Sequence, residues 1–218
     1  MPQNPLGQRE RGDLIDRAIE LAVKAHRKQK RKGTSKAYIS HPFAVSLILA
    51  GAGCSEEVIA AGILHDVVED ARVKTDRIRE EFGDRVAFIV EQCTEPDKRR
   101  SWEKRKQHTL DLLKEADERV KFVVCADKLH NIRTIARDYH VVGDRVWSRF
   151  RRGRADQKWY YTCLVNSLRP RTKDASYEKL YKELKRKVKE IFNEPQKGGN
   201  AWPKEVKERS FISRRRVR

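Results

Sequence analysis

The chain has 218 residues and a formal net charge of +18, with 50 Lys and Arg against 32 Asp and Glu. It has no uninterrupted run of about 18 apolar residues, which excludes an evident membrane-spanning helix and indicates no membrane partner. The positive charge favours a polyanionic partner, such as nucleic acid or a phosphorylated small molecule, unless it is simply a solvated basic surface.

Hydrophobic periodicity predicts an all-α chain of about eight to ten helices. The helix over 56–70 is apolar on most sides and is therefore expected to be central. In chain order, the expected helices cover 13–32, 42–51 (or to 53), 56–70, 75–83, 84 to about 93, 99–116, 119–138, 156–169 and 173–193.

Two regions differ in composition. The helical pattern runs to residue 194, so 1–194 is expected to form one domain. Residues 195–218 contain Gly198-Gly199 and end in the basic run Arg214–Arg218, and we expect a mobile tail. Such a tail could make salt-sensitive, sequence-independent contacts with nucleic-acid phosphates. The four cysteines lie far apart without C-x-x-C spacing, as expected of reduced residues in a cytoplasmic protein.

An unusual polar cluster interrupts the apolar helix expected over 56–70. His65, Asp66, Glu69 and Asp70 occupy positions i, i+1, i+4 and i+5, which we expect to share one helix face. Carboxylates this close resist burial unless a cation compensates them, and a divalent metal is the simplest compensation. The alternative is a solvated acidic helix end, but the neighbouring apolar residues argue against it.

Two further residues could complete such a site. His41 stands at an expected helix start, where its side chain can reach a neighbouring helix, although a lone histidine there is more often a capping or core residue. Asp127 lies within a mainly apolar helix, so its carboxylate should be buried and therefore paired or bound to metal. Histidine and aspartate together suit a first-row divalent ion.

Three motifs carry a resemblance to a known family. The segments YISHP (38–42), LHDVVED (64–70) and ADKLHNIRT (126–134), in this order and spacing, resemble the HD-domain hydrolases of the Rel/SpoT family. The likeness extends from about Ala25 to Leu168 and is closest to a small, hydrolase-only form, a small alarmone hydrolase. It implies an HD-domain helical bundle over 1–194. It also implies that a metal-activated water removes the 3′-pyrophosphate of (p)ppGpp, giving GDP or GTP and pyrophosphate.

The resemblance also implies roles for particular residues. Glu69 and Asp70 match the acidic pair that positions or deprotonates the attacking water. Four positions match those that hold a single metal ion, usually Mn²⁺: His41, His65, Asp66 and Asp127. Four more match positions around the nucleotide substrate: Arg31, Lys32, Asn131 and Thr134.

The chain departs from the family pattern at two points next to these residues. Ala71 follows the Glu-Asp pair where the family often has Thr, and Gly33 follows the Arg-Lys pair where it often has Ser. Both leave substrate preference open. One alternative is an HD phosphohydrolase acting on another phosphorylated nucleotide such as NADPH, and a second is a non-catalytic basic RNA-binding protein with an HD fold. The sequence leaves the oligomeric state open.

Overall fold

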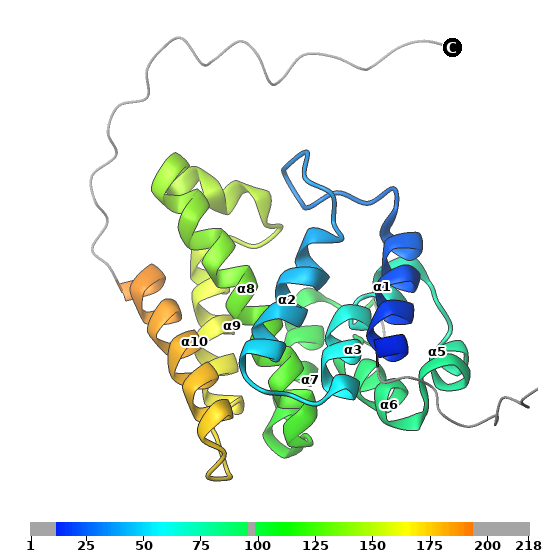
Figure 1. Ribbon diagram of the computed structural model, residues 1–218. Coiled ribbons are helices and arrows are strands. Elements are labelled where there is room, and N and C mark those ends of the chain that lie inside the picture. The colour runs from blue at the N-terminus through cyan, green and yellow to red at the C-terminus, as the bar shows by residue number, and fades with distance from the viewer. Residues whose placement is uncertain (1–11, 96–98, 194–218) are drawn as a thin grey trace, which may run out of the picture.

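The computed structural model describes residues 12–95 and 99–193, and this part of the chain is entirely helical apart from loops and one isolated β-bridge. The all-α prediction is confirmed, with ten α-helices and one 3-10 helix in the described ranges (Figure 1). The helices are α1 (Gly12–His26), α2 (Ser40–Gly51), α3 (Glu56–Leu64), α4 (Val67–Ala71), α5 (Thr75–Phe82), α6 (Asp84–Cys93), α7 (Trp102–Glu115), α8 (Glu118–Val142), η1 (Gly143–Arg149), α9 (Arg154–Ser167) and α10 (Ala175–Asn193).

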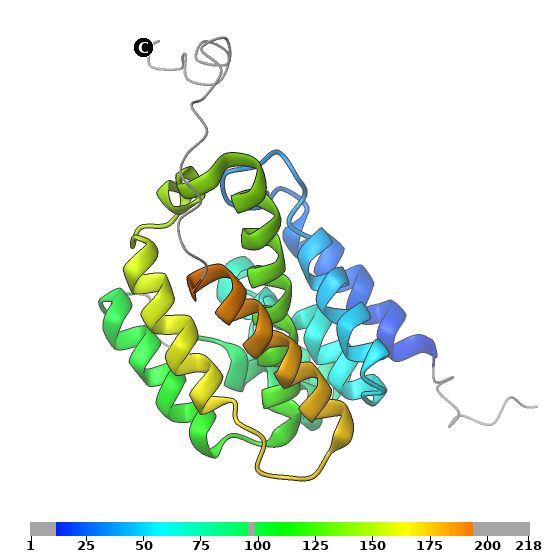
Figure 2. The same cartoon turned by 90° about the vertical axis from the view of Figure 1, so that its left-hand side faces the viewer.

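Two helices, α3 and α8, form the centre of the bundle. Helix α8 packs against α2, α3, α6, α10 and η1, while α3 packs against α1, α2, α6 and α8. Figures 1 and 2 show α9 and α10 alongside α8, on the side away from α1. Six of the nine α3 residues are buried, namely Val58 and the five consecutive residues 60–64, as the apolar sequence of this segment predicts.

A glycine sets the distance between α2 and α3. A Cβ atom on Gly62 would lie 2.3 Å from Cδ1 of Leu49, which is closer than two carbon atoms can approach. The missing side chain therefore lets the two helices pack closely; α2 carries His41 of the predicted metal site, and His65 directly follows α3.

Several predicted boundaries were wrong. The first helix ends at His26, and residues 27–39 form a loop in which Lys30 and Ala37 pair across a β-bridge. The helix expected over 56–70 is split, because α3 ends at Leu64 and α4 begins at Val67. Arg72, with a left-handed φ of 60°, then ends α4.

The expected basic tail, 195–218, lies outside the described residues, so its role stays a prediction. Within the described ranges, no helix is long and apolar enough to cross a membrane. All four cysteines are free, in agreement with the sequence.

Candidate metal centre

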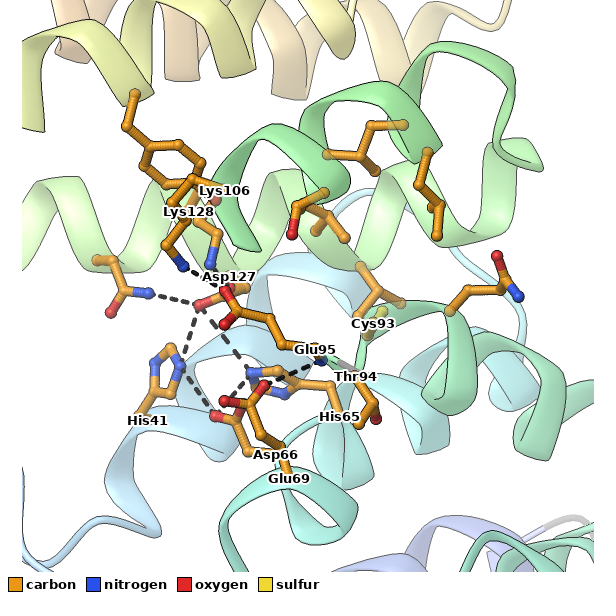
Figure 3. A pocket seen from close by; sticks show the side chains of 18 of the residues that line it. His41, His65, Asp66, Glu69, Cys93, Thr94, Glu95, Lys106, Asp127 and Lys128 are labelled. Atoms are coloured by element: carbon orange, nitrogen blue, oxygen red, sulfur yellow. Dashed lines mark hydrogen bonds and ion pairs between the residues drawn. The ribbon is translucent and has the colours of Figure 1, made fainter. Parts of the chain in front are cut away.

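Three mutually packed helices bring the four predicted metal ligands together (Figure 3). His41 lies in the first turn of α2, His65 and Asp66 lie between α3 and α4, and Asp127 lies in α8. Nε2 of His41 is 3.1 Å from Oδ1 of Asp127 and 3.7 Å from Oδ2 of Asp66. Nε2 of His65 is 3.0 Å from Oδ2 of Asp66 and 4.0 Å from Oδ1 of Asp127.

The break between α3 and α4 explains how two adjacent residues serve one site. On a continuous helix, side chains at i and i+1 point in different directions. His65 and Asp66 were predicted to share one face of a single helix, and this prediction was wrong. The chain instead turns at these two residues, so that both side chains reach the same point beside Asp127.

Both histidine rings are held through Nδ1, which leaves Nε2 directed at the carboxylates. His65 Nδ1 lies 2.7 Å from the carbonyl oxygen of Gly62 and donates to it. His41 Nδ1 lies 2.7 Å from Nδ1 of His130, and the two rings stack. Fixing one ring nitrogen in this way is how proteins orient a histidine that binds metal through the other.

The donor set fits a divalent metal. His41, His65 and Asp127 each offer one buried ligand atom, and these atoms lie within 4.8 Å of one another. Nε2 of His65 is buried and makes no hydrogen bond, although Asp66 lies close by. A buried ring nitrogen without a hydrogen bond is costly, and binding of a divalent cation by the deprotonated nitrogen would remove that cost. Two imidazoles and a carboxylate that could hold a metal ion are typical of HD domains, and such ligands suit a first-row ion.

Charge in the cluster is distributed unevenly. Burial opposes protonation of His65, but the carboxylates of Asp66 and Asp127 outweigh it and raise its pKa to about 9. For His41, burial prevails and lowers the pKa. Burial alone would raise the pKa of Asp66, but the adjacent His65 lowers it below its usual range. Without metal, the four predicted ligands therefore include two carboxylates and one protonated imidazole, and Lys128 lies beside Asp127 as a further cation.

Further polar residues surround the ligands. The Tyr38 hydroxyl donates to Oδ2 of Asp66 at 2.5 Å, and the Asn131 amide donates to Oδ1 of Asp127 at 2.5 Å. Nζ of Lys128 lies 2.6 Å from Oδ2 of Asp127. Such contacts orient carboxylate ligands and commonly contribute to metal affinity. Because Asp127 must be compensated in the core, its pairing with Lys128 also supports the fold.

A cavity of about 200 Å³ opens beside the metal cluster. Its lining includes the four predicted ligands, Arg31, Asn131 and Glu69, as well as residues that the sequence argument had not selected, among them Tyr38, Glu95, Lys106 and Lys128. Oε2 of Glu69 accepts a hydrogen bond from the backbone N–H of Glu95 at 3.3 Å. Asp70 is exposed and does not contribute to this lining.

A second cavity, of about 250 Å³, adjoins the first and shares Arg31, Tyr38 and Asn131 with it. All four predicted substrate-binding residues line it: Arg31, Lys32, Asn131 and Thr134. Arg31 and Asn131 contact each other across the boundary, through a 2.9 Å hydrogen bond from the guanidinium to the amide oxygen. Lys32 lies over the ring of Phe150, with Nζ 5.7 Å from the centroid.

The site residues that were not predicted fall into two groups, one with a signal in the sequence and one without. Tyr38, Lys128 and His130 belong to the same short motifs as the ligands, so their neighbourhood could have indicated them. Lys106 and Glu95 lie in segments without a motif, and their ion pair at 2.5 Å joins α7 to the residues that follow α6. Residues of this second kind require the three-dimensional structure.

The comparisons agree with this geometry. A family model described as an HD domain matches residues 18–156, and the chain belongs to the HD-domain family. Curated relatives include a GTP pyrophosphokinase of Streptomyces coelicolor, 40% identical over 124 residues, which are 56% of this chain and 14% of that protein. A guanosine-3′,5′-bis(diphosphate) 3′-pyrophosphohydrolase of Xenopus tropicalis is 36% identical over 127 residues, which are 57% of this chain and 70% of that protein.

The chain spans 14–18% of the length of the first three curated relatives. Among solved structures, lmo0812 of Listeria monocytogenes matches with a TM-score of 0.67 and 39% identity, over 71% of this chain and 99% of that one. A metazoan ortholog of SpoT that hydrolyses ppGpp matches with a TM-score of 0.64 and 26% identity, over 85% of this chain and 97% of that one. The chain thus belongs to the HD-domain family and is related to ppGpp 3′-pyrophosphohydrolases.

Proposed function

We propose that this protein hydrolyses the 3′-pyrophosphate of (p)ppGpp to GDP or GTP and pyrophosphate, using one Mn²⁺ ion. One observation carries the proposal. Nε2 of His65 is buried and has no hydrogen-bond partner, and it faces two carboxylates beside a cavity lined by lysine and arginine. The residues proposed to hold the ion are His41, His65, Asp66 and Asp127. The names of the relatives support the choice of substrate.

The reaction requires a water molecule to be positioned and deprotonated. A divalent ion at this site lowers the pKa of water and offsets charge on the phosphoryl group. We assign proton removal to Glu69, because it lines the cavity beside the ligands, and a supporting role to Asp70. The water oxygen bonds to the phosphorus attached to O3′, the P–O3′ bond breaks, and O3′ takes a proton to become the 3′-hydroxyl.

Positive side chains are suited to the charge that develops on the phosphates. Lys106 and Lys128 line the cavity at the metal cluster, and Arg31 borders both cavities. Cations fixed where negative charge develops stabilise the transition state of phosphoryl transfer. We assign the second cavity to the nucleoside, in contact with Lys32, Asn131 and Thr134.

The direct test is to incubate Mn²⁺-loaded protein with ppGpp and to measure GDP and pyrophosphate. The expected result is a one-to-one yield of the two products. Release of phosphate from NADPH with ppGpp left intact would assign the site to another nucleotide. Tight, salt-sensitive RNA binding without any hydrolysis would favour the non-catalytic alternative.

A further inference from the structure

The second cavity has an apolar lining of the kind that binds a planar ring. Its apolar lining comes from η1, α8 and α9, and includes Val146, Phe150, Tyr161 and Ile135. The basic loop 27–39 closes one side of it, and this loop and η1 lie at the same end of the bundle (Figures 1 and 2). Because the cavity joins the metal cavity at Arg31 and Asn131, a nucleotide hydrolysed at the metal can place its base here.

One ion pair supplies both hydrogen-bond donors and acceptors in this cavity. Nη1 of Arg149 lies 2.5 Å from Oδ2 of Asp138, and both residues line the cavity. Asp138 is the one carboxylate among the described lining residues. Its other oxygen lies 3.6 Å from Nε of Arg137, which lies outside the lining. An arginine has five N–H donors, so the contact with Asp138 leaves several for a ligand.

Gly33 holds Arg149 against the basic loop. The φ angle of Gly33 is +71°, and a Cβ atom there would lie 2.9 Å from Cδ of Arg149 and 3.1 Å from its Cγ. The aliphatic part of Arg149 therefore occupies the space that a side chain at residue 33 would fill. The position of Arg149 thus depends on the absence of a side chain at residue 33.

We propose that Asp138 and Arg149 select guanine over adenine, an inference that deepens the proposed function by assigning its base specificity. Guanine presents N–H donors at N1 and N2, which a carboxylate accepts, and acceptors at O6 and N7, which a guanidinium donates to. Adenine has an acceptor at N1 and would place its lone pair against the carboxylate. A site built around such hydrogen bonds rejects an analogue that cannot make them.

The test compares two substrates that differ in the base: guanosine and adenosine 3′,5′-bis(diphosphate). Wild-type protein should release pyrophosphate from the guanosine compound with kcat/KM roughly 10- to 100-fold higher. Asp138→Asn should lower this preference at least about 10-fold, because an asparagine amide can donate to adenine N1 and accept from its N6. Arg149→Met, which keeps the stem that lies against Gly33, should reduce the preference by a smaller factor.

Arg137→Gln is the matched control, since it removes an arginine near the same carboxylate but outside the cavity, and it should leave the preference unchanged. Mn²⁺ binding and the melting temperature report whether each variant is folded. An unchanged preference in folded Asp138→Asn and Arg149→Met would overturn the inference.

Equilibrium binding of GDP and ADP separates this inference from the proposed function, because it needs no hydrolysis. Tighter binding of GDP supports the base assignment even if neither bis(diphosphate) is cleaved, in which case the proposed function fails alone. Equal affinity for GDP and ADP, or binding of neither, overturns the base assignment. Equal pyrophosphate release from the guanosine and adenosine bis(diphosphates) would also overturn the base assignment, but it would leave the proposed hydrolysis intact.

Discussion

The metal cluster and the proposed base cavity share a wall but are built differently. The cluster comes from buried or largely buried side chains in α2, in α8 and at the junction of α3 with α4, and α2, α3 and α8 pack against one another. The base cavity depends on the loop 27–39 and on η1, and its polar residues Asp138 and Arg149 are partly exposed. The parts proposed to do chemistry thus belong to the core, while the parts proposed to choose the substrate lie where the chain is less constrained.

This contrast predicts different consequences of substitution. A change in the cluster should remove metal and activity together, because its residues depend on one another for charge balance. A change around the base cavity should alter which nucleotide is used and leave the metal bound. Functional diversity on a fixed scaffold commonly arises in this way, through loops carried on a rigid frame.

The largest expected effect is on the cluster side. Asp66→Ala should weaken Mn²⁺ affinity by more than about 100-fold, since loss of even an outer-shell partner commonly costs 10- to 100-fold. Metal content after dialysis and pyrophosphate release should fall together. Asp76→Ala, which removes an exposed carboxylate on α5, should change neither. Full metal retention in Asp66→Ala would exclude Asp66 as a ligand.

Glu69 and Asp70 test whether the catalytic base must line the cavity, because only Glu69 does so. Glu69→Gln should keep Mn²⁺ and lower kcat by roughly 10²- to 10⁴-fold, the usual contribution of a general base. Asp70→Asn should have a smaller effect, because Asp70 lies outside the lining. Single-turnover rates of the metal-loaded variants measure both. A greater loss in Asp70→Asn would transfer the role of base to Asp70.

The close packing of α2 against α3 at Gly62 supports both the core and the metal cluster. Gly62→Ala forces a Cβ atom against Leu49 and should lower the free energy of unfolding by about 1–3 kcal/mol, the usual cost of overpacking. Denaturant titration measures this change. Gly51→Ala is the control, because a Cβ atom there has no neighbour within 4 Å. Equal stability of the two variants would show that α2 can move away from α3 without cost.

The same contrast separates what the sequence could predict from what it could not. Periodicity predicted the helices, and the apolar surroundings of Asp127 predicted its burial, because both follow from local pattern. The break at His65-Asp66 was missed, since neither Gly nor Pro stands at it and the apolar sequence continues on both sides of it. Asp138 and Arg149 could not be paired from sequence, because their contact depends on where η1 leads the chain after α8.

The protonation of His65 in the metal-free protein gives a final prediction, which is tested by changing the pH. The pKa of His65, about 9, lies above the value of roughly 6.5 expected in an unfolded chain. Its proton therefore stabilises the metal-free fold fully below pH 6.5, and this contribution is lost as the pH rises through 9. A histidine must be neutral to bind a metal ion, so Mn²⁺ binding has to displace this proton.

Calorimetric titration of metal-free protein with Mn²⁺ at pH 7.5, in buffers of different ionisation enthalpy, should accordingly report release of about one proton. Because burial keeps the pKa of His41 low, this second histidine should contribute little to the count. Affinity for Mn²⁺ should rise with pH up to about 9 and then level off. Binding with no proton release would mean that His65 is already neutral in the empty site, and that Asp66 and Asp127 do not hold its proton.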